Sequence, residues 1–112
     1  MKNDQVYIEH ILEAIAKIEK YTEKLDEQEF RETDMVQDAV VRQIEVIGEA
    51  TKQLSDDKRE EHSEIPWKDI AGMRDNLIHN YFGVDLEQVW QTVKQDIPHL
   101  KNTLKEQYSE KN

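Results

Sequence analysis

The 112-residue sequence contains no cysteine, only two prolines and only three glycines. The lack of cysteine excludes disulfide bonds and cysteine nucleophiles, and it is compatible with a reducing compartment. No apolar run approaches the roughly 20 residues that span a membrane, and the N-terminus lacks the profile of a signal peptide. We therefore expect a cytoplasmic protein that does not act at a membrane.

Basic residues are also scarce, with 15 Lys and Arg against 25 Asp and Glu and a net charge of −10. This balance argues against non-specific binding to phosphate backbones, which needs a basic surface. Residues 66–82 differ, because Lys68 and Arg74 balance Asp69 and Asp75 there. Any contact with nucleic acid should therefore be local, and this neutral stretch is the candidate.

The length and the spacing of apolar residues indicate the fold. A chain of about 100–150 residues usually forms one core, so we expect residues 1–112 to be a single helical domain. Apolar residues recur at steps of three and four, as in amphipathic helices. We predict an all-α fold, an up-and-down bundle of four helices, with the last helix kinked or split at Pro98. The helices are expected at residues 5–25, 34–54, 66–80 and 86–104.

Polar residues indicate where these helices begin and end. Thr33 and Asp85 are candidate N-caps, and Gln88 would complete a capping box with Asp85. Pro66 suits the first position of the third helix, because its missing N–H is not needed there. The polar stretches 26–31 and 55–64 break the apolar pattern, so we expect them to be surface connections.

Gly48 lies inside the second predicted helix, where glycine costs about 1 kcal/mol relative to alanine. The expected reason is a close approach of another helix. Arg42 and Glu49 flank this glycine. We interpret them as solvated helix charges, and a role in a site stays open.

The segment 74–81 combines several polar groups that could carry chemistry. Asp75 and His79 are four residues apart, which brings their side chains together on a helix. We expect the carboxylate to orient the imidazole and to raise its pKa by favouring the protonated form. On a continuous helix Arg74 aligns with apolar neighbours, so its guanidinium needs a carboxylate of the protein or a phosphate from outside.

Arg74 and His79 are five residues apart, about 140° around an ideal helix, so one chain would not aim both at one atom. A two-fold contact on this helix would bring two copies of each into one cleft. An arginine that holds a phosphodiester and a histidine that moves protons suffice for metal-independent RNA cleavage by the 2′-OH. The alternative is structural: an ion pair, a cation at a helix end and a half-buried ring. The scattered histidines predict no metal site.

The segment Arg74–Tyr81 reads R-x4-H-x-Y and resembles the motif of HEPN-domain proteins of the HepT type. The resemblance extends over nearly the whole chain. Its further signs are Ile65-Pro66-Trp67, Gly72-Met73, Tyr81-Phe82-Gly83-Val84-Asp85, Val89-Trp90 and Ile47-Gly48-Glu49-Ala50.

This resemblance implies the toxin of a prokaryotic toxin–antitoxin pair, a homodimeric, metal-independent endoribonuclease without a cofactor that cleaves RNA in a cleft between protomers. Arg74 and His79 would be catalytic, with Asp75 and Asn76 in supporting positions. The antitoxin would be an MntA-type nucleotidyltransferase that attaches AMP to Tyr81. The alternative is a catalytically inactive helical module that binds such a nucleotidyltransferase, a hypothesis motivated by the acidic surface.

Overall fold

The computed structural model of the protein describes residues 4–73 and 85–110, and every regular element in these ranges is helical. The predicted all-α class is therefore confirmed. The count of four helices stays a prediction, because residues 74–84 lie outside the described ranges. None of the described helices is both long and apolar enough to cross a membrane.

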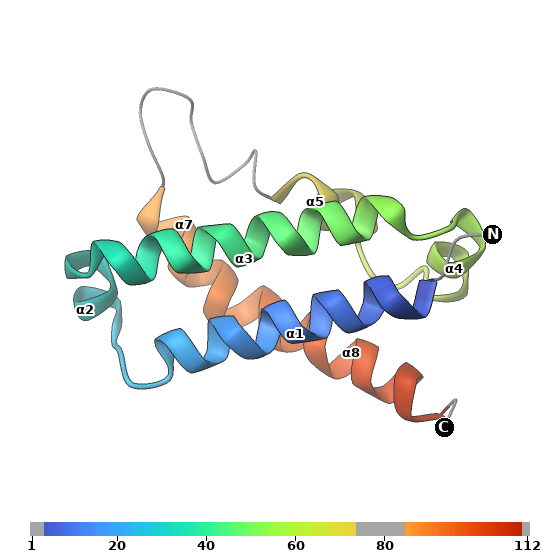
Figure 1. Ribbon diagram of the computed structural model, residues 1–112, viewed down its shortest axis with the longest axis horizontal. Coiled ribbons are helices and arrows are strands. Elements are labelled where there is room, and N and C mark those ends of the chain that lie inside the picture. Colours follow the sequence, from blue (N-terminus) through green and yellow to red (C-terminus); the bar gives the residue numbers. More distant parts are fainter. Residues whose placement is uncertain (1–3, 74–84, 111–112) are drawn as a thin grey trace.

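Two long antiparallel helices, α1 (Asp4–Thr22) and α3 (Asp34–Gln53), form the centre of the fold (Figure 1). Their buried residues follow the predicted steps of three and four, because one stripe of each helix faces the core. The main members of these stripes are Ile8, Ile11, Ile15 and Ile18 on α1 and Val40, Ile44, Ile47 and Thr51 on α3.

The C-terminal arm consists of α7 (Leu86–Gln91), a π-helical turn η2 (Thr92–Asp96) and α8 (Ile97–Glu110), which follow one another without a gap. The predicted split near Pro98 is present as this π turn. Pro98 has no N–H, and its ring crowds the carbonyl four residues earlier in an α-helix. In the wider turn the N–H of Ile97 bonds to the Thr92 carbonyl, five residues back.

Two short helices occupy stretches that we expected to be connections, so that prediction is wrong. Helix α2 (Glu27–Glu32) begins with a capping box, in which the Glu29 N–H donates to Asp26 Oδ1 at 2.8 Å and the Asp26 N–H donates to Glu29 Oε1 at 3.1 Å. Helix α4 (Asp56–Glu61) begins at Ser55, whose Oγ accepts from the Lys58 N–H at 3.1 Å. Six residues are too few for helical periodicity to show, and the caps are the remaining signal.

Thr33 occupies the predicted N-cap position of α3, but its side chain does not cap that helix. Its hydroxyl instead donates to the Glu29 carbonyl at 2.7 Å. The turn between α2 and α3 is also held by Gln37, whose side-chain amide donates to the carbonyls of Phe30 and Arg31 at 2.9 and 3.0 Å. Hydrogen bonds from the side chains of Thr33 and Gln37 to carbonyls at the end of α2 thus join the two helices.

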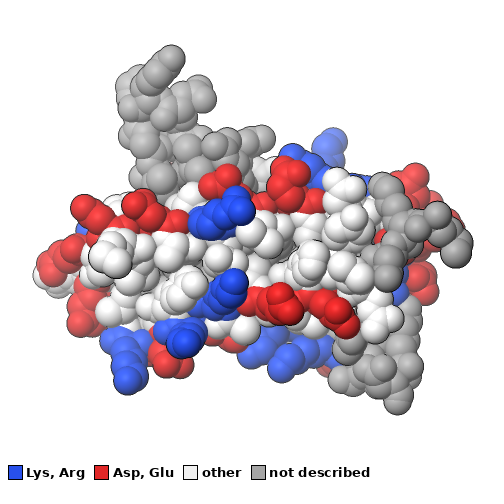
Figure 2. Space-filling view, in the orientation of Figure 1, with Lys and Arg blue, Asp and Glu red and all other residues white. Residues whose placement is uncertain are grey.

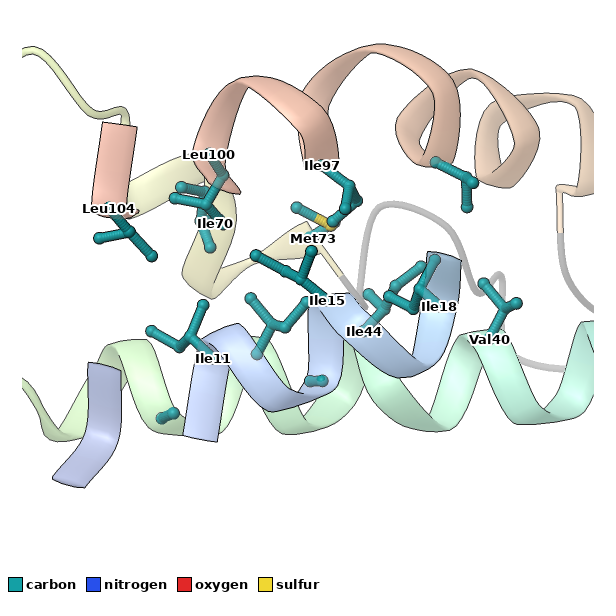
Figure 3. Packing of buried hydrophobic residues seen from close by; sticks show 14 of the residues in the cluster. Ile11, Ile15, Ile18, Val40, Ile44, Ile70, Met73, Ile97, Leu100 and Leu104 are labelled. Atoms are coloured by element: carbon teal, nitrogen blue, oxygen red, sulfur yellow. The ribbon is translucent and has the colours of Figure 1, made fainter. Parts of the chain in front are cut away.

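The hydrophobic core lies between α1, α3, the short helix α5 (Trp67–Ala71) and the C-terminal arm (Figure 3). Ile15, Ile44 and Ile97 are at most 1% exposed, and burying each such side chain contributes about 1.5–3 kcal/mol. At the far end of the core, Phe30 of α2 packs on Trp90 with ring centroids 5.3 Å apart. On the face viewed in Figure 2, charged side chains lie mainly along the edges of a largely uncharged band.

Candidate functional site

The predicted site residues Arg74, Asp75, Asn76, His79 and Tyr81 lie outside the described residues. Their roles therefore stay predictions. The structure does place the two ends that lead into this segment, and it places the helix faces beside them. Both ends are held by a buried tryptophan.

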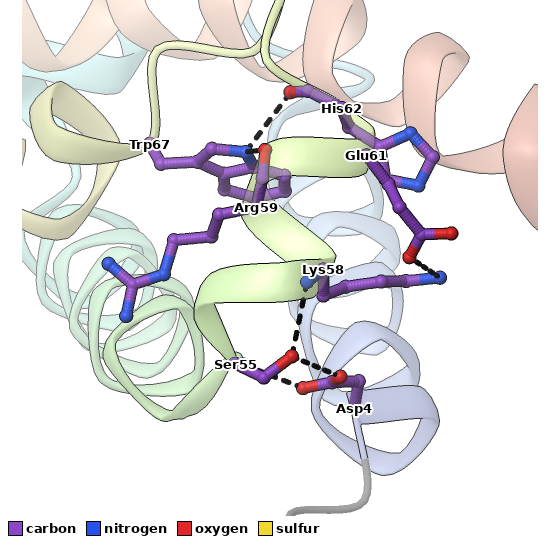
Figure 4. Close-up of polar contacts among 7 residues, drawn as sticks. All are labelled: Asp4, Ser55, Lys58, Arg59, Glu61, His62 and Trp67. Atoms are coloured by element: carbon purple, nitrogen blue, oxygen red, sulfur yellow. Dashed lines mark hydrogen bonds and ion pairs between the residues drawn. The ribbon is translucent and has the colours of Figure 1, made fainter.

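At the N-terminal end, Trp67 anchors α5 to the α4 region (Figure 4). Its indole Nε1–H donates to the carbonyls of Arg59 and His62, both at 3.1 Å. Pro66, the expected first helical residue, is instead the N-cap of α5, so the helix begins one residue later than predicted, at Trp67. The His62 ring is 3% exposed, and neither ring nitrogen has a hydrogen-bond partner in the described part of the chain.

The other end of α5 meets α3 at Gly48, as expected from a glycine inside a helix. A Cβ at Gly48 would lie 3.2 Å from the Ala71 carbonyl oxygen, which leaves no comfortable room for a side chain. The predicted close helix–helix approach is therefore confirmed. The contact places Ala71, three residues before Arg74, against the C-terminal half of α3.

Helix α5 is shorter than predicted. It ends at Ala71, and Gly72 is its C-cap with φ −93° and ψ 3°, before Met73 is again helical. The expectation of one helix from residue 66 to about 80 is thus wrong at Gly72, where glycine's poor helix propensity favours an end. The predicted alignment of Arg74 with Trp67 and Ala71 assumed a continuous helix. It therefore does not apply across the break at Gly72.

At the C-terminal end, Asp85 starts α7 as predicted, and its Oδ1 accepts from the Gln88 N–H at 3.1 Å. One turn later Trp90 is 9% exposed. One face of the Trp90 ring meets Phe30, and Lys94 Nζ lies 4.7 Å from its centroid, a cation–π distance. The residues after the segment are therefore anchored as firmly as those before it.

Beside Ala71, α1 and α3 form a polar groove of about 550 Å³. Tyr7 and His10 of α1 make one wall, with their rings edge to face and centroids 6.1 Å apart. The charged residues that line the groove from α3 are Arg42, Glu45, Glu49 and Lys52. The sequence drew attention to Arg42 and Glu49 through Gly48, whereas Tyr7 and His10 gave no signal, because their meeting with α3 is a tertiary contact.

A second cavity, of about 340 Å³, lies between α5 and the C-terminal arm. It is largely apolar, with Ile65, Ile70, Met73 and Leu100 in its walls. Thr92, the first residue of the π turn, also lines it.

The described ranges contain no group of three or more His, Asp or Glu side chains placed to hold a metal ion. The carboxylates of the groove, Glu45 and Glu49, lie on one helix with a lysine and an arginine among them. This arrangement suits an anion or a mixed-charge partner better than a divalent cation, which prefers several oxygen ligands.

Comparison with known proteins gives consistent matches. The profile described as Ribonuclease HepT-like matches residues 11–107. The chain is 50% identical over 95 residues to a protein of Thermococcus cleftensis named as probable ribonuclease HepT, covering 85% of this chain and 86% of that one. It is 42% identical over 106 residues to a protein of Caldanaerobacter subterraneus subsp. tengcongensis named as a candidate RNase, covering 95% of each.

A longer relative occurs in Methanocaldococcus jannaschii, and its name combines gamma-glutamylcyclotransferase with candidate RNase. The identity is 50% over 103 residues, which is 92% of this chain but 46% of that protein. The chain therefore spans about half the length of this relative. No solved structure matches the chain.

Proposed function

The chain belongs to the ribonuclease HepT-like family, and from this premise we propose that it is a metal-independent endoribonuclease, the toxin of a prokaryotic toxin–antitoxin pair. The observation that carries the proposal is the R-x4-H-x-Y motif at Arg74–Tyr81, which lies inside the matched range 11–107.

In the proposed reaction Arg74 holds the non-bridging oxygens of one RNA phosphate, for which a guanidinium offers two parallel donors. His79 takes the proton of the adjacent 2′-OH, and that oxygen attacks phosphorus. The bond from phosphorus to the 5′-oxygen breaks, and the leaving oxygen is protonated. The products are a 2′,3′-cyclic phosphate and a 5′-OH. Asp75 orients His79, and Asn76 supports the same cleft.

We place this cleft between two protomers of a homodimer. Arg74 and His79 are five residues apart, so on one ideal helix their side chains would diverge by about 140°. A two-fold axis gives each phosphate access to an arginine and a histidine from different chains. This arrangement makes dimerisation a requirement for cleavage.

The proposed regulation acts at Tyr81, two residues after His79. A partner nucleotidyltransferase of the MntA type attaches AMP to this phenol. The added negative charge and bulk then oppose entry of the RNA backbone. The partner thereby acts as the antitoxin.

The first test is cleavage of single-stranded RNA by the purified protein in EDTA. His79→Ala and Arg74→Gln should each lower the rate by about 10²-fold or more, since each removes a group needed in the transition state. Arg31→Gln is the matched control for charge, because that arginine is paired with Glu27 on α2, at 2.9 Å. DNA of the same sequence should stay intact, and the RNA fragments should carry cyclic phosphate ends. Equal cleavage by wild type and His79→Ala would contradict the proposal.

A mixture of the two inactive variants tests the composite cleft. Heterodimers of Arg74→Gln with His79→Ala regain one intact arginine and one intact histidine across the interface. Partial recovery of cleavage after subunit exchange is expected. No recovery, with exchange verified by mass spectrometry, would show that each site belongs to one chain.

Co-expression with a small nucleotidyltransferase from the neighbouring reading frame tests the regulation. An AMP mass increment should appear on the peptide that contains Tyr81 and should be lost in Tyr81→Phe. The net charge of −10 favours one competing function, an inactive module that only binds this partner. Stable co-purification without RNA cleavage by the free protein, unchanged in His79→Ala, would establish that function instead.

A further inference from the structure

The polar groove lies beside the C-terminal end of α5. Helix α5 starts with Trp67 beside Arg59 and His62, beyond the C-terminal end of α3, and reaches Gly48 of α3 at Ala71. It therefore runs antiparallel to α3 (Figure 1). Its end points along α3 toward the groove, which Ala71 itself lines. The groove is thus continuous with the last described residues before the catalytic motif.

Arg42 differs from the other arginines that the structure describes. The guanidinium of Arg31 donates from Nε and Nη2 to Glu27 Oε2, at 3.2 and 2.9 Å. Arg59 donates through the same two atoms to the Leu54 carbonyl, at 3.3 and 3.0 Å. Arg42 is exposed, and its guanidinium makes no hydrogen bond or ion pair within ranges 4–73 and 85–110. No described residue therefore occupies its planar donor set.

The other charged side chains of the groove each have an interaction within the protein. Lys52 Nζ lies 3.4 Å from Glu49 Oε1, so this lysine is already paired. Glu45 is half-buried and has an interaction of its own. Among the described residues that line the groove, Arg42 is therefore the cation that an anion can reach without displacing a described partner.

We propose that this groove binds single-stranded RNA and that Arg42 contacts a backbone phosphate next to the one that is cleaved. The inference rests on the proposed ribonuclease function and names how that site holds its substrate. An arginine fork matches a phosphate better than a lysine does, because it donates two parallel hydrogen bonds. RNA can bind at this groove although the protein is acidic, because physiological salt screens the repulsion between its phosphates and distant carboxylates.

The test measures RNA binding without cleavage. A fluorescein-labelled single-stranded RNA of mixed sequence is titrated with protein in the His79→Ala background, at several salt concentrations. Arg42→Gln should weaken binding about tenfold and reduce the slope of log affinity against log salt by about 0.7, the loss of one phosphate contact. Arg31→Gln removes the same charge from α2 and should change neither quantity. Glu49→Gln removes a groove carboxylate and should strengthen binding.

The outcomes separate this inference from the proposed function. If Arg42→Gln binds RNA like Arg31→Gln, with the same salt slope, the groove proposal is overturned, even where His79→Ala abolishes cleavage. Binding that depends on Arg42 in a protein that never cleaves RNA would support the groove and count against the ribonuclease. If Arg42→Gln leaves RNA binding intact but weakens co-purification with the nucleotidyltransferase, the groove is a protein-docking surface and the RNA proposal is overturned.

Discussion

The two faces of α3 come from the same stretch of sequence but have different roles. One face, with Ile44 and Ile47, is at most 1% exposed and packs into the core with α1. The other, with Arg42 and Glu49, is exposed and forms a wall of the groove beside α5. The first face supplies stability, and the second offers an arginine whose guanidinium bonds to no described residue. Substitutions on the core face should therefore change the free energy of unfolding, whereas substitutions on the groove face should change RNA binding.

The largest effect on stability is expected on the core face. Ile47→Ala should lower the free energy of unfolding by about 2–5 kcal/mol, because it removes a fully buried side chain and leaves a cavity. Urea denaturation followed by circular dichroism measures this change. Val46→Ala on the groove side is the control, since Val46 is only half-buried and should cost clearly less. Similar losses for both would mean that the two faces do not differ as described.

The next effect is expected at Gly48, where the two faces meet. Gly48→Val should lower stability by about 1–3 kcal/mol, because its side chain must push α5 away from α3. Gly72→Ala is a suitable comparison, since among the described residues its Cβ would meet the Lys68 carbonyl oxygen, at an ordinary 3.5 Å. The same denaturation series measures both. If Gly48→Val is as stable as Gly72→Ala, the close approach at Ala71 does not constrain the packing.

The smallest effect on stability is expected on the groove face. Arg42→Gln should change the free energy of unfolding by no more than about 0.5 kcal/mol, because the side chain is exposed and has no partner in the described ranges. The same variant should weaken RNA binding, so stability and binding respond to opposite faces of the helix. A large loss of stability would instead assign Arg42 a structural role.

Much of the fold could be predicted because its signals are local. The stripes of α1 and α3 and the cap at Asp85 each depend on one segment and its propensities. The glycine inside α3 also indicated a close approach, but not which helix makes it. The short helices α2 and α4 were missed, since six residues show no periodicity. The break at Gly72 was missed because the residues on both sides of it follow helical spacing, although glycine itself has a low helix propensity.

The candidate site was predicted only in part. The motif Arg74–Tyr81 was visible as a pattern of residues, but the alignment of Arg74 with Trp67 depended on a continuous helix, and α5 ends before it. Tyr7 and His10 could not be associated with Arg42, because they lie more than 30 positions from it in the chain. Helical spacing describes neighbours three and four residues apart and says nothing about such pairs.

By itself the sequence determined the helical class, the buried face of each long helix and the motif that places the chain in its family. These properties follow from residue types and their spacing, which act over one or two turns. Only the tertiary structure decided that α5 packs on Gly48, that Trp67 is bonded to α4, and that Arg42 faces Tyr7 across a groove. The reason is physical: these contacts join distant segments, and packing of the whole core sets them.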